Sequence, residues 1–269
     1  MNDDPSSHDL YASWLEKIRR KISANKALRG HDTKAPLLSA GDEVVNGLEK
    51  PVESFIAAID DPHSVGAEQF RLFAVRLEGL WKQPGFQRVA ITSTLPGEGK
   101  SFTTINVACV LAKDFGRRVL VIDGDFRKPT LWRFLGNTPS KGILDVIAKP
   151  QEINSAVHPL RFQNLGVLGV GLTSVNPTRF WKSQAIKHLF AEFERQYDYI
   201  IVDTPPVLTV VDTTLIADLV DGVVVIVRTG TTPKASLQKA IASIPRAKLV
   251  GTVFNGAKGL RAYQYYHLR

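Results

Sequence analysis

The pattern of hydrophobic and polar positions divides the chain into two regions that meet near residue 66. Beyond that point, short runs rich in Val and Ile alternate with longer segments whose apolar residues recur at helical spacing. The expected strands are 88–94, 117–125, 165–171, 197–206, 222–230 and 248–255, and the expected helices are 66–81, 100–115, 177–196, 213–220 and 233–244. Near-continuous apolar strands between helices predict an α/β fold with a mostly parallel sheet covered by helices on both faces.

The N-terminal region is rich in charge and turn formers and lacks strand-like runs. Its segment 9–26 places apolar side chains at helical spacing beside basic ones. The apolar positions are Leu10, Tyr11, Trp14, Leu15, Ile18 and Ile22, and the basic ones are Lys17, Arg19, Arg20 and Lys21. This spacing predicts an amphipathic helix. Two interpretations are open: the helix packs on the main domain, or it binds an anionic membrane surface or a partner helix.

The end of the chain is unusually rich in tyrosine. Tyr263, Tyr265 and Tyr266 are three of the six tyrosines and fall within the last seven residues. Aromatic side chains at a chain end have little to pack against, so the tail is expected to dock on a partner or to be a substrate. The resulting division is an extension over 1–65, a main domain over 66–255 and a flexible tail over 256–269.

Composition narrows the class of protein. With 269 residues, 44% of them hydrophobic, the chain can bury one sizeable core. A net charge of +8 favours anionic partners without choosing among them. The single cysteine, Cys109, excludes an internal disulfide and fits a reducing cytosol. No run approaches eighteen uninterrupted apolar residues, and the N-terminus is acidic and polar, so we expect a cytoplasmic protein that is soluble or peripheral to a membrane.

The stretch STLPGEGKS, residues 93–101, carries the core of a phosphate-binding loop between an expected strand and an expected helix. Glycines let backbone N–H groups converge on phosphate oxygens, and the helix N-terminus adds its positive end. Lys100 would reach the outer phosphates, and the Ser101 hydroxyl would contact a magnesium ion. The expected nucleotide contacts are Pro96, Gly97, Glu98, Gly99, Lys100, Ser101 and Phe102. A glycine turn without a ligand is the alternative.

Acidic residues follow two of the buried strands. Asp123 and Asp125 end the run VLVIDGD, and Asp203 follows the apolar run YIIV. Buried carboxylates are costly unless they meet a cation, and the strand ends of an open parallel sheet border the ligand crevice. Each aspartate alone could be a simple cap. Together with the phosphate loop, the three predict magnesium–nucleotide chemistry.

At this point the chain resembles a known family. The segments ITSTLPGEGKS, VLVIDGDFRKPTL and YDYIIVDTPPVL, with a terminal tyrosine cluster, are similar to the bacterial tyrosine kinases (BY-kinases) of capsule and exopolysaccharide synthesis. These are the cytoplasmic ATPase part of polysaccharide co-polymerases. The resemblance runs from about Glu68 to the C-terminus and implies a P-loop NTPase fold. It assigns Lys100 and Ser101 to the Walker A loop, Asp123 and Asp125 to the Walker A′ motif, and Asp203 to Walker B.

Some positions depart from the patterns of the family and its superfamily. Thr94 stands where a strict phosphate loop has Gly or Ala. The partition ATPases have a second, signature lysine early in the loop. This chain has Leu95 at that position, and the kinases also lack the lysine there. The kinases have a Glu-x-x-Arg-x-x-Arg helix that pairs subunits in a ring, and here Glu68 and Arg71 match while Ala74 replaces the second arginine.

The resemblance also implies roles for the site residues, with ATP and Mg²⁺ as cofactors. Asp123 would accept the proton of the attacking tyrosine, and Lys100 would stabilise charge on the phosphates. Ser101, Asp125 and Asp203 would hold the magnesium ion. In a separate position, Asn255 would present its side chain to the nucleotide base, or it is simply a turn residue before a glycine.

The expected function is therefore an ATP-dependent protein-tyrosine autokinase that phosphorylates Tyr263, Tyr265 and Tyr266 in trans and regulates polysaccharide synthesis and export. The alternative is a P-loop ATPase switch that controls a partner through its nucleotide state. Expected partners are a membrane adaptor of a polysaccharide co-polymerase, further copies of the chain in a ring or smaller oligomer, and a membrane surface through the N-terminal helix. A nucleic-acid partner is not expected, because no helix-turn-helix or basic–aromatic stripe is present.

Overall fold

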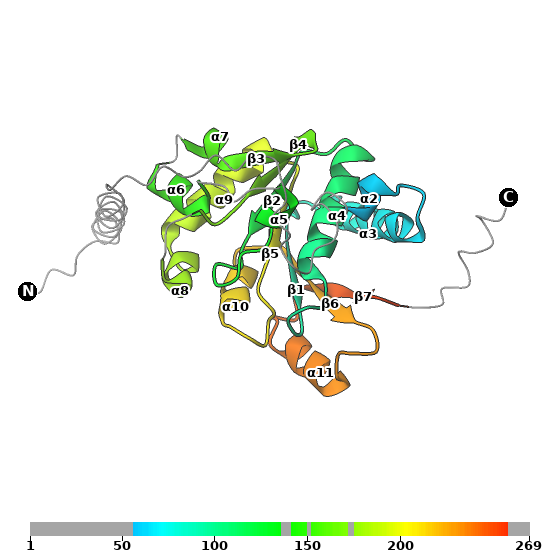
Figure 1. The fold of residues 1–269 in the computed structure, drawn as a ribbon. Coiled ribbons are helices and arrows are strands. Elements are labelled where there is room, and N and C mark those ends of the chain that lie inside the picture. Colours follow the sequence, from blue (N-terminus) through cyan, green and yellow to red (C-terminus); the bar gives the residue numbers. More distant parts are fainter. Residues whose placement is uncertain (1–55, 136–140, 150–151, 172–174, 258–269) are drawn as a thin grey trace, which may run out of the picture.

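A computed structural model describes residues 56–135, 141–149, 152–171 and 175–257, and the helices, strands and contacts given below are those of these residues. They form a seven-stranded sheet in the order β3-β4-β2-β5-β1-β6-β7, with helices on both faces (Figure 1). The strands are β1 (Arg88–Ser93), β2 (Val119–Asp123), β3 (Val157–Leu160), β4 (Phe162–Leu168), β5 (Tyr199–Asp203), β6 (Gly222–Arg228) and β7 (Leu249–Asn255). The helices are α2 (Ala57–Asp60), α3 (Val65–Trp81), α4 (Lys100–Lys113), α5 (Trp132–Leu135), α6 (Ile143–Ala148), α7 (Ile153–Ala156), α8 (Pro177–Trp181), α9 (Gln184–Gln196), α10 (Asp212–Ala217) and α11 (Lys234–Ala242).

All strand pairs are parallel except β3 with β4, which confirms the expected α/β fold. Each of the six expected strands is present. Strand β3 was not expected, because its four residues, VHPL, contain a proline and form no apolar run. As an antiparallel edge strand it tolerates the missing N–H of Pro159.

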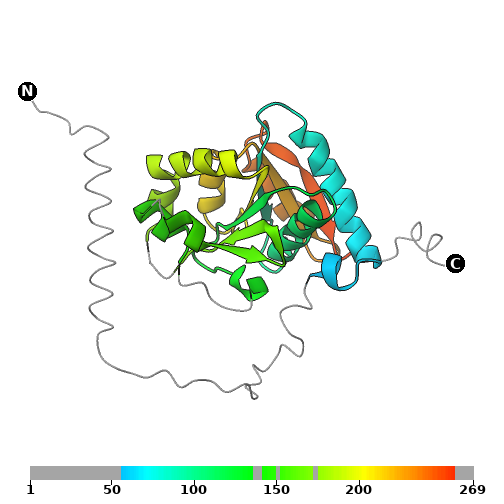
Figure 2. The same ribbon diagram turned by 90° about the horizontal axis from the view of Figure 1, so that it is seen from above.

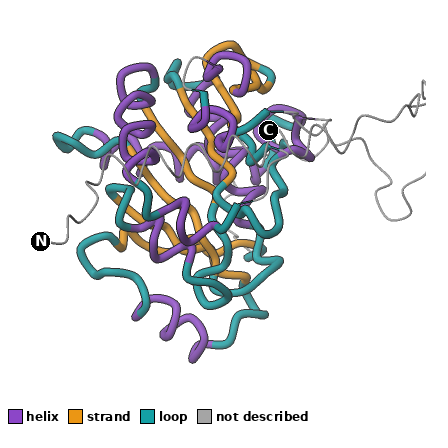
Figure 3. The backbone as a smooth tube through the Cα atoms, turned by 90° about the vertical axis from the view of Figure 1, so that its left-hand side faces the viewer, coloured by secondary structure: helices purple, strands orange, loops and turns teal. Residues whose placement is uncertain are grey.

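Two hydrophobic layers, one on each face, hold the sheet. On one face, α2, α3 and α4 pack against residues such as Ile91, Val121 and Ile226. On the other, helices that include α6, α8, α9, α10 and α11 pack against residues such as Leu120 and Val225. Seen from above, α3 and α9 lie on opposite sides of the strands (Figure 2). The tube view shows the strands side by side with helices around them (Figure 3).

The described residues before 66 also pack on the main domain. Ile56 and Ala58 are buried, and the backbone N–H of Ala58 donates to Oδ1 of Asn106 at 3.1 Å. This short apolar segment carries too little periodicity to stand out from the polar region before it. The expected amphipathic helix of the N-terminal region and the tyrosine tail lie outside the described residues.

The long helix expected over 177–196 is two helices. Helix α8 ends at Trp181, and Ser183 has an extended backbone and caps α9 by accepting the N–H of Ile186 at 3.4 Å. A serine N-cap starts a new helix because its hydroxyl satisfies an N–H without an intrahelical partner. None of the described helices is long and apolar enough to cross a membrane.

Helix α9 offers a test of the core. Phe190 is fully buried with its ring 6.4 Å from that of Phe193. Phe190→Ala should lower the free energy of unfolding by about 3–5 kcal/mol, because it removes apolar contacts and leaves a cavity. Urea unfolding measures this. Lys187→Ala, at an exposed position of the same helix, should change it by no more than about 0.5 kcal/mol. Equal effects would contradict the packing.

Candidate active site

The loop between β1 and α4 has the geometry of a phosphate cradle. Gly97 and Gly99 have φ of +81° and +90°, in the left-handed region that favours glycine. Helix α4 begins at Lys100 directly after Gly99, so the free N–H groups of its first turn face the loop. A side chain on Gly99 would meet Nδ2 of Asn255 at 2.1 Å. The loop therefore requires glycine here, and it can bind a phosphate group.

Three side chains hold this loop in shape. The carboxylate of Glu98, a residue only 4% exposed, accepts the backbone N–H of Leu95 at 2.9 Å and the hydroxyl of Thr232. Nδ2 of Asn255 donates to the carbonyl of Glu98 at 2.8 Å. Among the site residues expected to contact nucleotide, Glu98 and Asn255 thus contact the loop itself. The contacts from Thr232 and Asn255 position the loop from just beyond β6 and from the end of β7.

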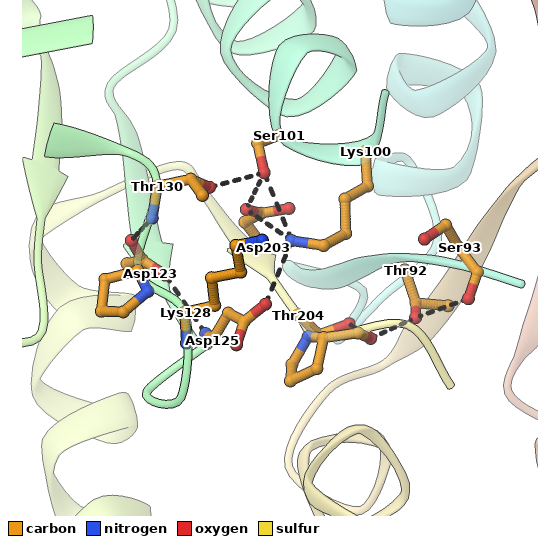
Figure 4. Close-up of polar contacts among 12 residues, drawn as sticks. Thr92, Ser93, Lys100, Ser101, Asp123, Asp125, Lys128, Thr130, Asp203 and Thr204 are labelled. Atoms are coloured by element: carbon orange, nitrogen blue, oxygen red, sulfur yellow. Dashed lines mark hydrogen bonds and ion pairs between the residues drawn. The ribbon is translucent and has the colours of Figure 1, made fainter. Parts of the chain in front are cut away.

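The aspartates meet Lys100 and Ser101 at the carboxyl ends of β2 and β5 (Figure 4). Nζ of Lys100 lies 3.3 Å from Oδ2 of Asp203 and 3.5 Å from Oδ2 of Asp125. The hydroxyl of Ser101 donates to Oδ2 of Asp203 at 2.6 Å. Asp123 and Asp203 are paired residues in the β2–β5 register. Residues from three distant parts of the chain therefore converge.

Asp123 accepts hydrogen bonds from the backbone that the sequence did not predict. Its carboxylate accepts three backbone N–H groups at 3.1 Å, from Asp125 on Oδ1 and from Thr130 and Leu131 on Oδ2. Burial, together with the charge of Asp203, raises the pKa of Asp123 to about 7. Asp123 thereby fixes the loop after β2, and Oδ1, which accepts one N–H group, can accept a further hydrogen bond.

Thr130 is a site residue that sequence reasoning missed. Its hydroxyl lies 2.9 Å from Oγ of Ser101, so it reaches the same cluster from the loop after β2. The only signal in the sequence is its place shortly after the two aspartates, which does not by itself indicate a contact.

The cluster carries more negative than positive charge. Burial opposes ionisation of Lys100, but the carboxylates of Asp203, Asp125 and Asp123 outweigh it and raise the pKa of Lys100. Burial raises the pKa of Asp203, although Lys100 and Ser101 oppose this. Three carboxylates around one ammonium group leave a site suited to an additional cation.

The donor set fits magnesium bound together with phosphates. Ser101, Asp125 and Asp203 offer hard oxygen ligands, which Mg²⁺ prefers. Within the described residues, no three His, Cys, Asp or Glu side chains are arranged to hold a metal alone. Mg²⁺ usually takes one or two carboxylates and completes its shell with water and substrate phosphates.

Other expected site residues fall in different places. Phe102 follows Ser101 on α4, and its ring packs edge-on against Phe70 of α3 at 5.8 Å, so it contacts protein. Ala74, at the position of the second family arginine, is fully buried on the inner side of α3. Arg71 is engaged within the chain by Glu68 and Asp114. Tyr263, Tyr265 and Tyr266 lie outside the described residues.

The chain matches one protein-family model, and the similar curated proteins are named as tyrosine-protein kinases. A family model described as an AAA domain matches residues 86–249. The chain is 36% identical to the tyrosine-protein kinase YwqD of Bacillus subtilis over 78% of its own length and 89% of the relative. It is 30% identical to the putative tyrosine-protein kinase CapB of Staphylococcus aureus, over 77% and 92%. It is 32% identical to the putative tyrosine-protein kinase EpsB of Ralstonia nicotianae, but spans only 27% of that longer protein.

Solved structures show the same fold. The chimerical protein CapA2B2 superposes with a TM-score of 0.70 at 29% identity, covering 75% of this chain and 89% of that one. The BceF tyrosine kinase domain superposes with a TM-score of 0.66 at 28% identity, covering 74% and 81%. The similarity therefore extends over the described domain in both sequence and fold.

Proposed function

Because this chain belongs to the bacterial tyrosine-protein kinases, we propose that it transfers the γ-phosphoryl group of ATP to its own tyrosines Tyr263, Tyr265 and Tyr266. The observation that carries the proposal is the convergence of Lys100, Ser101 and the aspartates beside a glycine loop. Phosphoryl transfer depends mainly on positioning and charge stabilisation, which this cluster can supply. The tyrosine-rich end of the chain supplies acceptors.

Binding of the nucleotide follows from the loop. The N–H groups of residues 97–102 would donate to phosphate oxygens, and Lys100 would lie against the outer phosphates. Mg²⁺ would be held by the hydroxyl of Ser101 and the carboxylates of Asp125 and Asp203. An ion held there would supply positive charge against the phosphate oxygens.

Transfer forms one bond and breaks one. The tyrosine oxygen attacks the γ-phosphorus, and the bond between that phosphorus and the β–γ bridging oxygen breaks, releasing ADP. The tyrosine hydroxyl, which has an ordinary pKa of about 10, is neutral at cytosolic pH and must lose its proton. Asp123 is the proposed acceptor, as the family resemblance implies, because a carboxylate beside Mg²⁺ can orient the hydroxyl and accept its proton.

Phosphorylation in trans would also regulate assembly. Each phosphate adds about −1.5 to −2 charges, and the site is lined by carboxylates, so a phosphorylated tail would be repelled. The variant with all three tyrosines changed to Phe should then stay associated when ATP is added, whereas the wild type dissociates. Light scattering before and after ATP measures this. If the variant dissociates as readily as the wild type, phosphorylation does not control the assembly.

The assignment to polysaccharide synthesis rests on the family resemblance. We propose that a membrane adaptor of a polysaccharide co-polymerase recruits the chain to the inner face of the cell membrane. The division into an extension over 1–65, a kinase domain over 66–255 and a substrate tail over 256–269 fits this arrangement, with residues 56–65 packed on the domain.

A second function, an ATP-driven switch without kinase output, is favoured by one observation. The buried position of Ala74 leaves no place for the arginine that pairs subunits in the family ring. Such a switch would hydrolyse ATP with water as the acceptor and leave the tail bare. Assaying ADP release and phosphotyrosine in the same sample separates the two functions.

The hydrogen bond from Thr232 to Glu98 of the loop can be tested directly. Thr232→Val leaves the buried carboxylate of Glu98 without its hydroxyl donor, at a cost of about 1–3 kcal/mol. We expect the KM for ATP to rise by about tenfold, because the loop loses its shape. Thr231→Val, at the exposed neighbouring position, should leave KM unchanged. An unchanged KM in Thr232→Val would show that Glu98 does not need this partner.

A further inference from the structure

An apolar groove of about 760 Å³ lies between α3 and the edge strand β7, on the side of the sheet that α3 and α4 cover. Side chains that line it include Val65, Phe70, Leu72, Phe73, Leu80 and Val253. Val65 and Leu72 are 42% and 40% exposed. Apolar side chains gathered in one hollow, rather than scattered singly, indicate a surface that something covers.

The two faces of the sheet differ at this edge. On the opposite face, Ala240 of α11 and Ile244 just after it belong to the same packed layer as Val223, Val225 and Val227 of β6. On the groove side, Val224 of β6 and Val253 of β7 belong to the layer under α3 and α4 and also line the hollow, where Val253 is only partly buried. Parallel strands normally bury both faces under helices. The edge therefore has room for one more helix beside α3.

A buried polar group in the groove also lacks a partner. Gln69 of α3 lines the hollow, and its Nε2 is buried without a hydrogen-bond acceptor among the described residues. Leaving a buried donor unpaired carries a desolvation cost, so a covering segment that brings an acceptor would recover stability.

We propose that the groove is covered by residues 10–22 of the same chain, folded as a helix alongside α3. These residues carry six large apolar side chains at helical spacing, which is the pattern a helix needs to cover an apolar strip. The chain reaches the domain at the right place, because Ala57, at the start of α2, lines the groove. Figure 2 shows α2 at one end of α3.

The connection is long enough. Residues 23–55 separate the segment from the domain, and a flexible linker of that length spans on the order of 30 Å. The tail from residue 258 also leaves next to the groove, through Ala257, but its tyrosines must reach an active site to be phosphorylated. The N-terminal segment carries no such requirement, so it is the occupant we favour.

A helix docked in the groove would contact residues that lie next to the phosphate-binding loop. Phe102, which lines the groove, directly follows Ser101 at the start of α4 and packs against Phe70 of α3. The covering helix would buttress this pair. The docking itself does not require kinase activity, but the choice of the N-terminal segment over the tail rests on the proposed function.

Hydrogen exchange of the full chain, followed by mass spectrometry, tests the proposal. An isolated helix of this length is marginal in water, so residues 10–22 exchange slowly only if they are docked. We expect protection of about tenfold or more over an unstructured chain. Leu72→Asp, in the groove, should abolish it. Val75→Asp, equally on α3 and 53% exposed but outside the groove, should leave it intact.

The same experiment identifies other occupants. Unprotected residues 10–22 in the wild type, or equal protection in both aspartate variants, would overturn the proposal. Protection that rises with protein concentration would assign the groove to a second copy of the chain. Exchange in α3 and β7 that accelerates when residues 258–269 are deleted would assign it to the tail. Trp14→Asp should release the segment as Leu72→Asp does, while Arg20→Ser, on the polar side of the helix, should not.

Discussion

Replacing Lys100 with methionine is expected to lower phosphate incorporation into the tail by about 100-fold or more. Methionine keeps an unbranched side chain of similar length but removes the charge. The lysine is protonated at neutral pH, because the three carboxylates raise its pKa despite burial. Its charge is therefore available to stabilise the phosphates as the bond to ADP breaks. Transfer of labelled phosphate from ATP, at saturating nucleotide, measures the loss.

The matched control is Lys113→Met, in the last turn of the same helix, where the side chain is exposed. It should keep full activity. A Lys100→Met protein that phosphorylates its tail at a rate near that of the wild type would show that the loop lysine takes no part in transfer. A folded Lys100→Met protein, verified by circular dichroism, is required for either conclusion.

Asp203→Asn is expected to lower activity by about 100-fold as well, without destabilising the nucleotide-free protein. Asp203 is fully buried, and burial raises its pKa. A carboxylate with a raised pKa is costly to keep charged in the folded state above that pKa. The neutral amide removes this cost, while Lys100 retains Asp125 as a partner. We expect the free energy of unfolding to stay the same or rise.

Asp221→Asn is a control that should lower stability and leave activity unchanged, the opposite of Asp203→Asn. Although burial opposes ionisation, Arg88 and the backbone N–H groups of Gln87 and Arg88 hold the pKa of Asp221 below its usual value. That carboxylate stabilises the fold at neutral pH and lies away from the site. Asp221→Asn should cost about 1–3 kcal/mol and keep activity. If Asp203→Asn instead destabilised the protein as Asp221→Asn does, its loss of activity would be explained by unfolding.

Local sequence was enough to predict most of the fold. Six strands and the loop before α4 follow from apolar runs and a glycine-rich turn, which act within a few residues. Strand β3 was missed because a four-residue edge strand with Pro159 has no apolar pattern. The break between α8 and α9 was missed because Ser183 is a common surface residue, and its role as a cap depends on backbone geometry.

The candidate site also has some features that the sequence predicts and others that it does not. Lys100, Ser101 and Asp203 could be placed together because strand order brings strand ends to one edge. The hydrogen bond from Thr232 to Glu98 joins residues 134 positions apart, and no local sequence pattern predicts it. The three N–H groups on Asp123 depend on how the following loop turns back. Long-range contacts of this kind appear only once the chain is folded.

Mapping phosphotyrosine after incubation with Mg²⁺ and ATP tests the central claim most directly. Purified full-length protein would be digested and analysed by mass spectrometry, with Lys100→Met treated in parallel. We predict phosphate on Tyr263, Tyr265 or Tyr266 in the wild type and none in the variant. ATP turnover with an unmodified tail would contradict the kinase assignment and leave the nucleotide-dependent switch as the function of this site.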